Sequence, residues 1–257
     1  MFFCRRYWKN YMDDFLLREE MLLGGEAVEK LRDSHVAVFG LGGVGSWCAE
    51  GLARAGIGEI TLIDSDEFSV TNINRQLGAL RSTIGRPKAE VMAERLRDIN
   101  PDIAIIPITG LYNAENRDSF FPGKVAETEG TAYSFVADCI DLVSCKLDLI
   151  MTCWERNIPI ISALGTGNKR NAQLLEISDI SKTKGDALAR VMRKELRARG
   201  VNRHPVVFSP EESMEPEQRE APPPGRRSVP GSLVWVPAAA GLLMTQYIVT
   251  EISTCKQ

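Results

Sequence analysis

A glycine-rich turn, "GLGGVG" at residues 40–45, stands between an apolar run and a segment typical of a helix. The run "HVAVFG" before it favours a buried strand, "GSWCAEGLARAG" after it favours a helix, and "EITLID" favours a second strand. Strand, helix and strand in this order form a βαβ unit, whose two strands are parallel. A chain with this unit near its start is expected to fold around a parallel sheet.

The same turn carries the first functional signal. Glycine permits tight turning and lets backbone N–H groups approach a phosphate at a helix N-terminus, and the turn supplies Gly40, Gly42, Gly43 and Gly45. Asp64 ends the second strand, where an acidic side chain binds a ribose hydroxyl in Rossmann-like units. Alone, these residues predict a nucleotide site, with a glycine turn needed only for packing as the alternative.

Strand-like and helix-like segments continue to alternate along the chain. A helix is predicted from Lys88 to Asn100, strands in "IAIIPI" and "YSFVADCI", a helix from Leu142 to Asn157, and a strand in "IPIISAL". This pattern predicts an α/β fold with a mainly parallel sheet covered by helices on both faces. The 257 residues are expected to form one domain, with a nucleotide-binding core at 14–168 and a smaller strand and helix extension at 169–257.

The extension contains three distinct segments. "NAQLLEISDI" reads as a strand, and "GDALARVMRKELRARG" as an amphipathic helix with the apolar stripe Leu188, Val191, Met192 and Leu196. Residues 209–231 are rich in proline and glutamate and predict a flexible loop. The apolar stretch from Leu233 to Val249 is interpreted as a strand and a buried helix, because it is short and interrupted for a membrane span.

Charge and cysteine content limit the classes of function. Lys and Arg number 31 against 34 Asp and Glu, so any contact with nucleic acid must be local. The segment from Lys182 to Arg203 is the strongest candidate, since its many basic residues face only Asp186 and Glu195. The six cysteines form no C-x-x-C pair, so no zinc is expected. No secretory signal precedes the fold, which predicts a cytoplasmic protein.

Polar residues after two predicted strands refine the nucleotide hypothesis. "DSDEFSVTNINRQ" places Asn72 and Arg75 just after the second strand, and Lys88 follows in "GRPKAE". Two cations beside a glycine loop suit a triphosphate better than a nicotinamide cofactor. In "VADCIDLVSCK", Asp138 and Asp141 end another strand; Asp141 is a candidate Mg²⁺ ligand, whereas Asp138 is expected to cap the following helix.

These motifs, taken in order, resemble a known family. "GLGGVG", "IDSDEFSVTNINRQ", "RPKAEVMAERLRDINP" and "DCIDLVSCK" are similar to the Rossmann-like adenylation fold of the E1-like superfamily, which includes ThiF and MoeB relatives. Within it, "LARVMRKELRARG" and "PGSLVWVPAAAGLLM" are most similar to the tRNA threonylcarbamoyladenosine dehydratase branch. The resemblance covers nearly the whole chain, from Phe15 to about Ile252.

The resemblance implies an ATP- and Mg²⁺-dependent enzyme that activates a carboxylate as an acyl-adenylate. Its substrate would be N6-threonylcarbamoyladenosine at position 37 of tRNA, and the net reaction would be loss of water. The glycine loop would bind the ATP phosphates, Asp64 the ribose and Asp141 the Mg²⁺, while Asn72, Arg75 and Lys88 would line the phosphates. Arg18 matches an arginine that reaches the partner's phosphates, which implies a homodimer.

Two other functions remain open on the sequence. One is adenylation of the C-terminus of a ubiquitin-like sulfur carrier of the ThiS or MoaD type; the missing C-x-x-C pairs count against it. The other is a non-catalytic Rossmann module that binds NAD or a protein. Some dehydratase relatives have a cysteine before the region of "VVFSPEE", where this chain has Arg203, His204 and Pro205, which counts against a sulfur-relay partner. No catalytic cysteine is expected.

Overall fold

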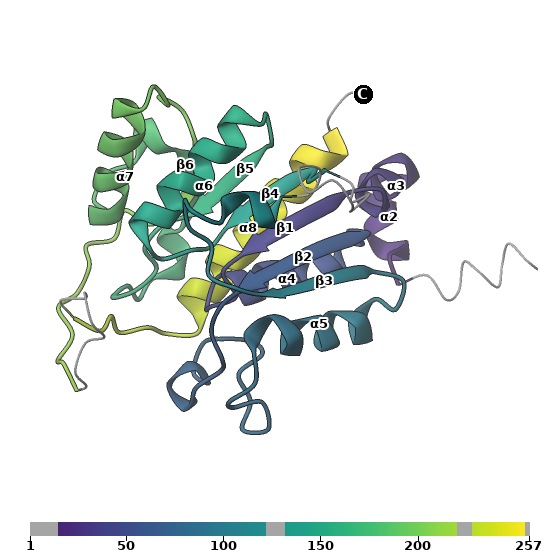
Figure 1. The fold of residues 1–257 in the computed structure, drawn as a ribbon, viewed down its shortest axis with the longest axis horizontal. Helices are drawn as coiled ribbons and strands as arrows, with labels where there is room; N and C mark the ends of the chain where they lie inside the picture. The colour runs from purple at the N-terminus through teal and green to yellow at the C-terminus, as the bar shows by residue number, and fades with distance from the viewer. Residues whose placement is uncertain (1–14, 122–131, 220–227, 255–257) are drawn as a thin grey trace, which may run out of the picture.

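The computed structural model describes residues 15–121, 132–219 and 228–254, and its fold is drawn in Figure 1. The strands are β1 His35–Phe39, β2 Glu59–Asp64, β3 Ala104–Thr109, β4 Phe135–Asp138, β5 Ile160–Ala163, β6 Glu176–Asp179 and β7 Pro205–Phe208. The helices are α2 Leu17–Leu23, α3 Gly25–Arg32, α4 Gly45–Arg54, α5 Lys88–Ile99, α6 Val143–Glu155, α7 Ala187–Ala198 and α8 Trp235–Thr254.

The seven strands form one sheet in the order β3-β2-β1-β4-β5-β7-β6. All neighbouring strands are parallel except β6, which pairs antiparallel with β7 at the edge. The chain starts in the middle of the sheet at β1, moves outward to β3, and then returns to the other side of β1 with β4. The predicted α/β class is therefore confirmed, and the order reverses between β1 and β4, where open α/β sheets bind ligands.

Helices cover both faces of the sheet, as the sequence predicted (Figure 1). All five residues of β1 are buried, and alternate side chains enter two separate cores. Val36 and Val38 pack with α4, α5 and α8, whereas Ala37 and Phe39 pack with α6, α7 and an aromatic group that includes Tyr112 and Phe120.

The last helix lies directly against the helix that follows the glycine loop. A Cβ atom added to Gly241 of α8 would lie 2.4 Å from the carbonyl oxygen of Val44 and 2.9 Å from the amide nitrogen of Cys48. A Cβ on Gly51 of α4 would lie 2.4 Å from Oγ1 of Thr245. The two helices therefore depend on glycine at both places, because any larger residue would force their backbones apart.

Three local predictions in the C-terminal half are wrong. Residues 233 and 234 form no strand; α8 begins at Trp235, with Pro237 in its first turn, where a missing N–H costs nothing. In α7, Met192 and Leu196 of the predicted stripe are buried and Leu188 packs against the same core, but Val191 is 43% exposed and Ala189 is buried in its place. The strand β7 was not predicted, and β6 is shorter than the segment expected to form it.

The described ends of the proline-rich loop are hydrogen-bonded to residues 168–171. The Glu211 carboxylate accepts the N–H groups of Arg170 and Asn171 at 3.0 Å, and the N–H of Met214 donates to the Asn168 carbonyl at 2.9 Å. On the other side, the N–H of Gly231 donates to Oδ1 of Asn168 at 2.7 Å. These bonds fix both ends of the loop beside the carboxyl end of β5; residues 220–227 lie outside the described part.

No helix in the described part of the chain combines the length and the apolar character that crossing a membrane requires.

Candidate nucleotide-binding site

The carboxyl ends of β1, β2 and β4 bring together most of the predicted site residues. The turn after β1 is attached to β2, because the N–H of Gly40 donates to the Ile63 carbonyl at 2.8 Å and that of Leu41 donates to Oδ2 of Asp64 at 2.6 Å. The N–H of Cys139, just after β4, donates to the Phe39 carbonyl at 2.8 Å. The glycine loop, Asp64 and the segment with Asp138 and Asp141 therefore share one edge.

The glycines of the loop are needed for different structural reasons. Gly40 has φ of 89°, a conformation that favours glycine, and a Cβ on Gly45 would lie 1.7 Å from the carbonyl oxygen of Gly40. A Cβ on Gly43 would lie 3.1 Å from Cβ of Pro237, at the start of α8. At Gly42 the nearest atom is Nε2 of Gln76 at 3.9 Å, so this part of the loop is open to the close approach of a ligand.

Asp64 is held in a fixed orientation at the end of β2. Its Oδ2 accepts the N–H of Leu41, and its Oδ1 accepts the N–H of Asp66 at 2.8 Å. Burial raises the pKa of Asp64 above its ordinary value, and the nearby Lys88 ammonium acts in the opposite direction. Each carboxylate oxygen keeps acceptor capacity after these bonds, as a ribose hydroxyl requires.

Two of the three residues expected to line the phosphates, Asn72 and Arg75, lie in the connection between β2 and α5. Asn72 ends a short 3-10 helix, where its side chain accepts the N–H of Ser69 at 3.1 Å. Nη1 of Arg75 donates to the Thr71 carbonyl at 2.8 Å and to Oδ1 of Asn74 at 3.0 Å, which fixes the guanidinium within this connection.

Lys88, at the start of α5, is 5% exposed. Its Nζ lies 2.9 Å from Oδ2 of Asp66 and 4.0 Å from Oδ1 of Asp64. The lysine therefore joins Asp64 and Asp66 to the start of the helix, and these two carboxylates balance its charge.

Gln76 lies beside the same loop and was absent from the predicted site. It is buried, and its Oε1 is a buried side-chain atom for which the described residues supply no hydrogen-bond partner. A buried carbonyl oxygen without a partner costs free energy, so such an atom beside the glycine loop fits a ligand that completes its bonding. The sequence signal was its place directly after Arg75.

Asp138 and Asp141 have different surroundings. Asp141 is exposed at the carboxyl edge, as a carboxylate that meets Mg²⁺ and phosphates needs to be. Asp138 is fully buried and caps no helix, because α6 begins at Val143 and its N-cap residue is Leu142. The capping prediction for Asp138 is therefore wrong.

Asp138 instead belongs to a buried polar network. Its Oδ2 accepts from Nζ of Lys146 at 2.8 Å and from the hydroxyl of Ser162 at 2.6 Å, and its Oδ1 accepts the N–H of Ile140 at 3.1 Å. The Ser162 hydroxyl also lies 2.8 Å from Nε2 of His204. Burial, with the nearby Lys146 ammonium, lowers the pKa of His204 to about 3, so this imidazole is neutral.

Arg18 lies on α2, at the opposite edge of the sheet. The chain runs from α2 through α3 into the amino end of β1, whereas the glycine loop follows the carboxyl end (Figure 1). Arg18 is exposed, and so are the neighbouring apolar residues Met21 and Leu22, at 78% and 87%. The structure therefore does not bring Arg18 to the glycine loop of its own chain.

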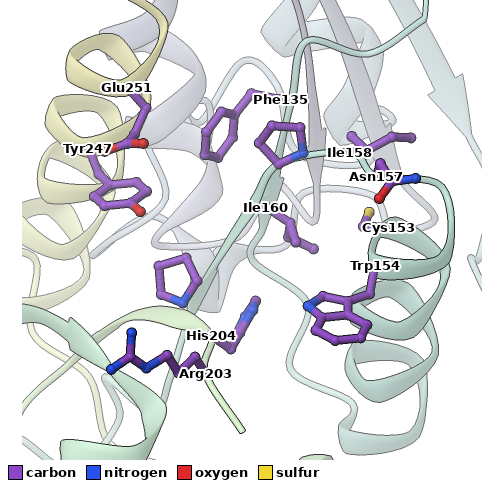
Figure 2. Close-up of a pocket in the computed structure, with 12 residues that line it drawn as sticks. Phe135, Cys153, Trp154, Asn157, Ile158, Ile160, Arg203, His204, Tyr247 and Glu251 are labelled. Carbon is purple, nitrogen blue, oxygen red and sulfur yellow. The ribbon is translucent and has the colours of Figure 1, made fainter. Parts of the chain in front are cut away.

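A second concave region opens at the amino edge, at the first residues of β4, β5 and β7. This pocket has a volume of about 500 Å³, and Trp154, Arg203, His204 and Tyr247 are among the residues that line it (Figure 2). Cys153 also lines it, and burial raises the pKa of its thiol, which suits packing rather than nucleophilic chemistry. None of the predicted site residues belongs to this pocket.

Among residues 15–121, 132–219 and 228–254, no group of three or more His, Cys, Asp or Glu side chains is arranged to hold a metal ion. Mg²⁺ at a nucleotide site needs no such cage, because one or two carboxylates and the phosphates bind it together with water.

Comparison with known proteins gives consistent results. The ThiF family matches residues 16–256. The tRNA threonylcarbamoyladenosine dehydratase of Bacillus subtilis (strain 168) is 38% identical over 244 residues, which cover 91% of this chain and 93% of that protein. The protein of the same name from Escherichia coli (strain K12) is 43% identical over 177 residues, which cover 69% of this chain and 63% of that protein.

The fold is also similar to a solved structure with a bound nucleotide. The E. coli tRNA N6-threonylcarbamoyladenosine dehydratase, TcdA, in complex with ATP, superposes with a TM-score of 0.78 at 35% identity. The similarity covers 91% of each chain.

Proposed function

The chain belongs to the ThiF family, and we propose that it is an ATP-dependent tRNA-modifying enzyme that dehydrates N6-threonylcarbamoyladenosine at position 37 of tRNA. The observation that carries this proposal is the edge where the open glycine loop, the oriented Asp64 carboxylate and the buried Gln76 Oε1, which has no partner among the described residues, meet. Near full-length similarity to a named dehydratase, and to one with bound ATP, supports both the substrate and the nucleotide.

The reaction has two steps. In the first, a carboxylate oxygen of the threonyl group attacks the α-phosphorus of ATP, which forms an acyl-adenylate and releases pyrophosphate. In the second, the neighbouring carbamoyl group attacks the activated carbonyl carbon, closes a ring and releases AMP. The carboxylate oxygen leaves with AMP, so the net change in the nucleoside is loss of one water. Such chemistry depends mainly on positioning and on fixed charge near the phosphates.

The chain's residues suit these needs. The N–H groups at Gly40, Gly42, Gly43 and Gly45 would bind phosphate oxygens at the start of α4, and Asp64 would accept from the ribose hydroxyls. Asn72, Arg75 and Lys88 would contact the phosphates, with Arg75 stabilising the charge that develops on them. Asp141 would hold Mg²⁺, which neutralises phosphate charge when bound.

The distance of Arg18 from its own site supports a homodimer in which it acts on the partner's phosphates. The exposed Met21 and Leu22 beside it offer apolar area for such an interface. We propose that catalysis takes place in the cytoplasm, where tRNA is available, and that neither zinc nor a sulfur-relay protein takes part.

The decisive experiment is mass spectrometry of tRNA nucleosides. The purified protein is incubated with ATP, Mg²⁺ and tRNA that carries N6-threonylcarbamoyladenosine. The modified nucleoside should lose the mass of one water, and AMP should appear in equal amount. An ATP analogue with a methylene group between the α- and β-phosphates should support binding but no conversion.

Adenylation of a sulfur carrier is the alternative that the same fold permits. A carrier with a free C-terminal carboxylate is therefore tested in parallel for ATP–pyrophosphate exchange. Exchange that depends on the carrier, together with unchanged tRNA nucleosides, would replace the proposed function by this one.

A further inference from the structure

Trp235 is a large aromatic residue whose side chain is only half buried. It begins α8 and is 51% exposed, yet its ring is fixed in orientation, because Nε1 donates to the Arg170 carbonyl at 2.7 Å. The Arg170 side chain is exposed next to it. We refer to Trp235 and Arg170 together as the Trp–Arg ledge.

The ledge lies next to the candidate nucleotide site. Pro237, two residues after Trp235, packs against Gly43 of the glycine loop. Ser232, three residues before Trp235, accepts from Nδ2 of Asn74 at 2.9 Å through its carbonyl oxygen. The segment that carries the indole therefore spans the space between the glycine loop, the connection with Arg75, and residues 168–171.

The charge of the ledge is not neutralised by the described acidic residues. Glu211 is the acidic residue bonded to this loop, and its two carboxylate oxygens accept the backbone N–H groups of Arg170 and Asn171. No carboxylate of the described residues forms an ion pair with the Arg170 guanidinium. A fixed aromatic face beside an available guanidinium is what proteins use to stack unpaired nucleobases and to hold the adjoining phosphate.

We propose that the Trp–Arg ledge receives an unpaired base of the tRNA anticodon loop, next to the modified adenosine, by stacking on Trp235 and contact of Arg170 with the phosphate. This inference rests on the proposed function and adds the surface that holds the RNA beside ATP. A nucleotide at position 37 is single-stranded, so its neighbours have free faces for stacking. Stacking there positions the threonyl carboxylate without any contact with its own atoms.

The chain supplies a matched control in Trp154. It is 54% exposed, almost as much as Trp235, but it lies at the amino edge beside the pocket of Figure 2. Any general effect of removing an exposed tryptophan should appear equally in both variants.

The test uses the full chain and an anticodon stem-loop RNA that carries N6-threonylcarbamoyladenosine. Binding is measured by fluorescence anisotropy, and stacking by quenching of tryptophan emission. W235A should weaken RNA binding about 5- to 150-fold, the range for one stacked base, whereas W235F, which keeps an aromatic face but not the Nε1 hydrogen bond, should lose less than W235A. W154A should bind normally. RNA should quench the emission of W154F strongly and that of W235F much less.

The affinity for ATP with Mg²⁺, measured by calorimetry, should be the same in all four variants. Wild-type RNA affinity in W235A, together with quenching of W235F emission as strong as that of W154F, would overturn the ledge, even if dehydration is confirmed. A wild-type protein that binds ATP but not the RNA would instead overturn the proposed function, and the ledge with it. Loss of dimer in W235A by native mass spectrometry would assign Trp235 to the subunit interface and reject the stacking role.

Discussion

Removing the ammonium from the buried Asp138–Lys146 pair should destabilise the fold strongly. Lys146 is 1% exposed and Asp138 0%, with 2.8 Å between Nζ and Oδ2. Breaking a buried pair from one side typically costs about 3–5 kcal/mol, because the remaining charge stays out of water. The hydroxyl of Ser162 and the N–H of Ile140 would still donate to Asp138, so we expect K146M to lie in the lower part of that range, about 3–4 kcal/mol.

For a chain of this length, about 3–4 kcal/mol corresponds to a fall in Tm of roughly 6–16 °C. The assay is thermal unfolding followed by circular dichroism, at one protein concentration because the proposed dimerisation would change apparent stability. R199M is the control: Arg199 pairs with Glu195 at 2.7 Å, but on the surface, where the loss should stay within about 1 kcal/mol.

The double variant D138N/K146M tests the mechanism further. It removes both charges, so it should recover part of the stability that K146M loses. The reasoning would be refuted if K146M melted within about 2 °C of R199M, or if the double variant were less stable by the full sum of the two single changes.

Further variants test the roles proposed for the other residues. D141A should lose Mg²⁺-dependent ATP turnover by about a hundredfold or more with an unchanged circular dichroism spectrum, since the residue is exposed; normal turnover would reject the metal role. Mixed subunits of R18A and D141A should regain activity that neither has alone, and failure to regain it in dimers verified by native mass spectrometry would reject action across the interface. The pKa of His204 in the folded protein is about 3, below its unfolded value, so its contribution to stability is present above pH 6.5 and is lost as the pH falls below that value. Between pH 6.5 and pH 5 the free energy of unfolding of the wild type should fall by about 2 kcal/mol more than that of H204Q. Parallel curves of unfolding free energy against pH for the two proteins would contradict this. Three exposed cations of α7 are neutralised together: Arg190, Lys194 and Arg197. The slope of the logarithm of the tRNA binding constant against the logarithm of the salt concentration should flatten by about two to three units, with ATP affinity unchanged. An unchanged slope would place the RNA elsewhere.

The alternation of short apolar runs with helical periods predicted the order of the first five strands and the helices between them. Such signals are local, so they survive without knowledge of the tertiary structure. The run "LVWV" failed because four apolar residues fit a strand or a buried helix equally well. Trp235 and Val236 instead begin α8, which packs closely on α4 at Gly241.

The position of the site was predictable, but the roles of single residues were less so. The glycine loop and Asp64 follow strand ends, which a sequence reveals directly. Asp138 was misassigned because its partner Ser162, and His204, which bonds to Ser162, come from segments far along the chain. Arg193 belongs to the basic segment from Lys182 to Arg203 that the sequence offered for RNA, yet its Nη1 donates to the Thr183 carbonyl and hydroxyl at 2.8 and 2.6 Å. Tertiary contacts of this kind leave no local pattern.

The contact between α8 and α4 also bears on when the site forms during synthesis. The glycine loop is made early, but Pro237 and Gly241, which pack against Gly43 and Val44, are made nearly two hundred residues later. A nascent chain that has completed only its βαβ unit leaves this side of the loop uncovered. We therefore expect ATP binding to arise only after α8 has emerged from the ribosome, so that chains arrested before it occupy no nucleotide.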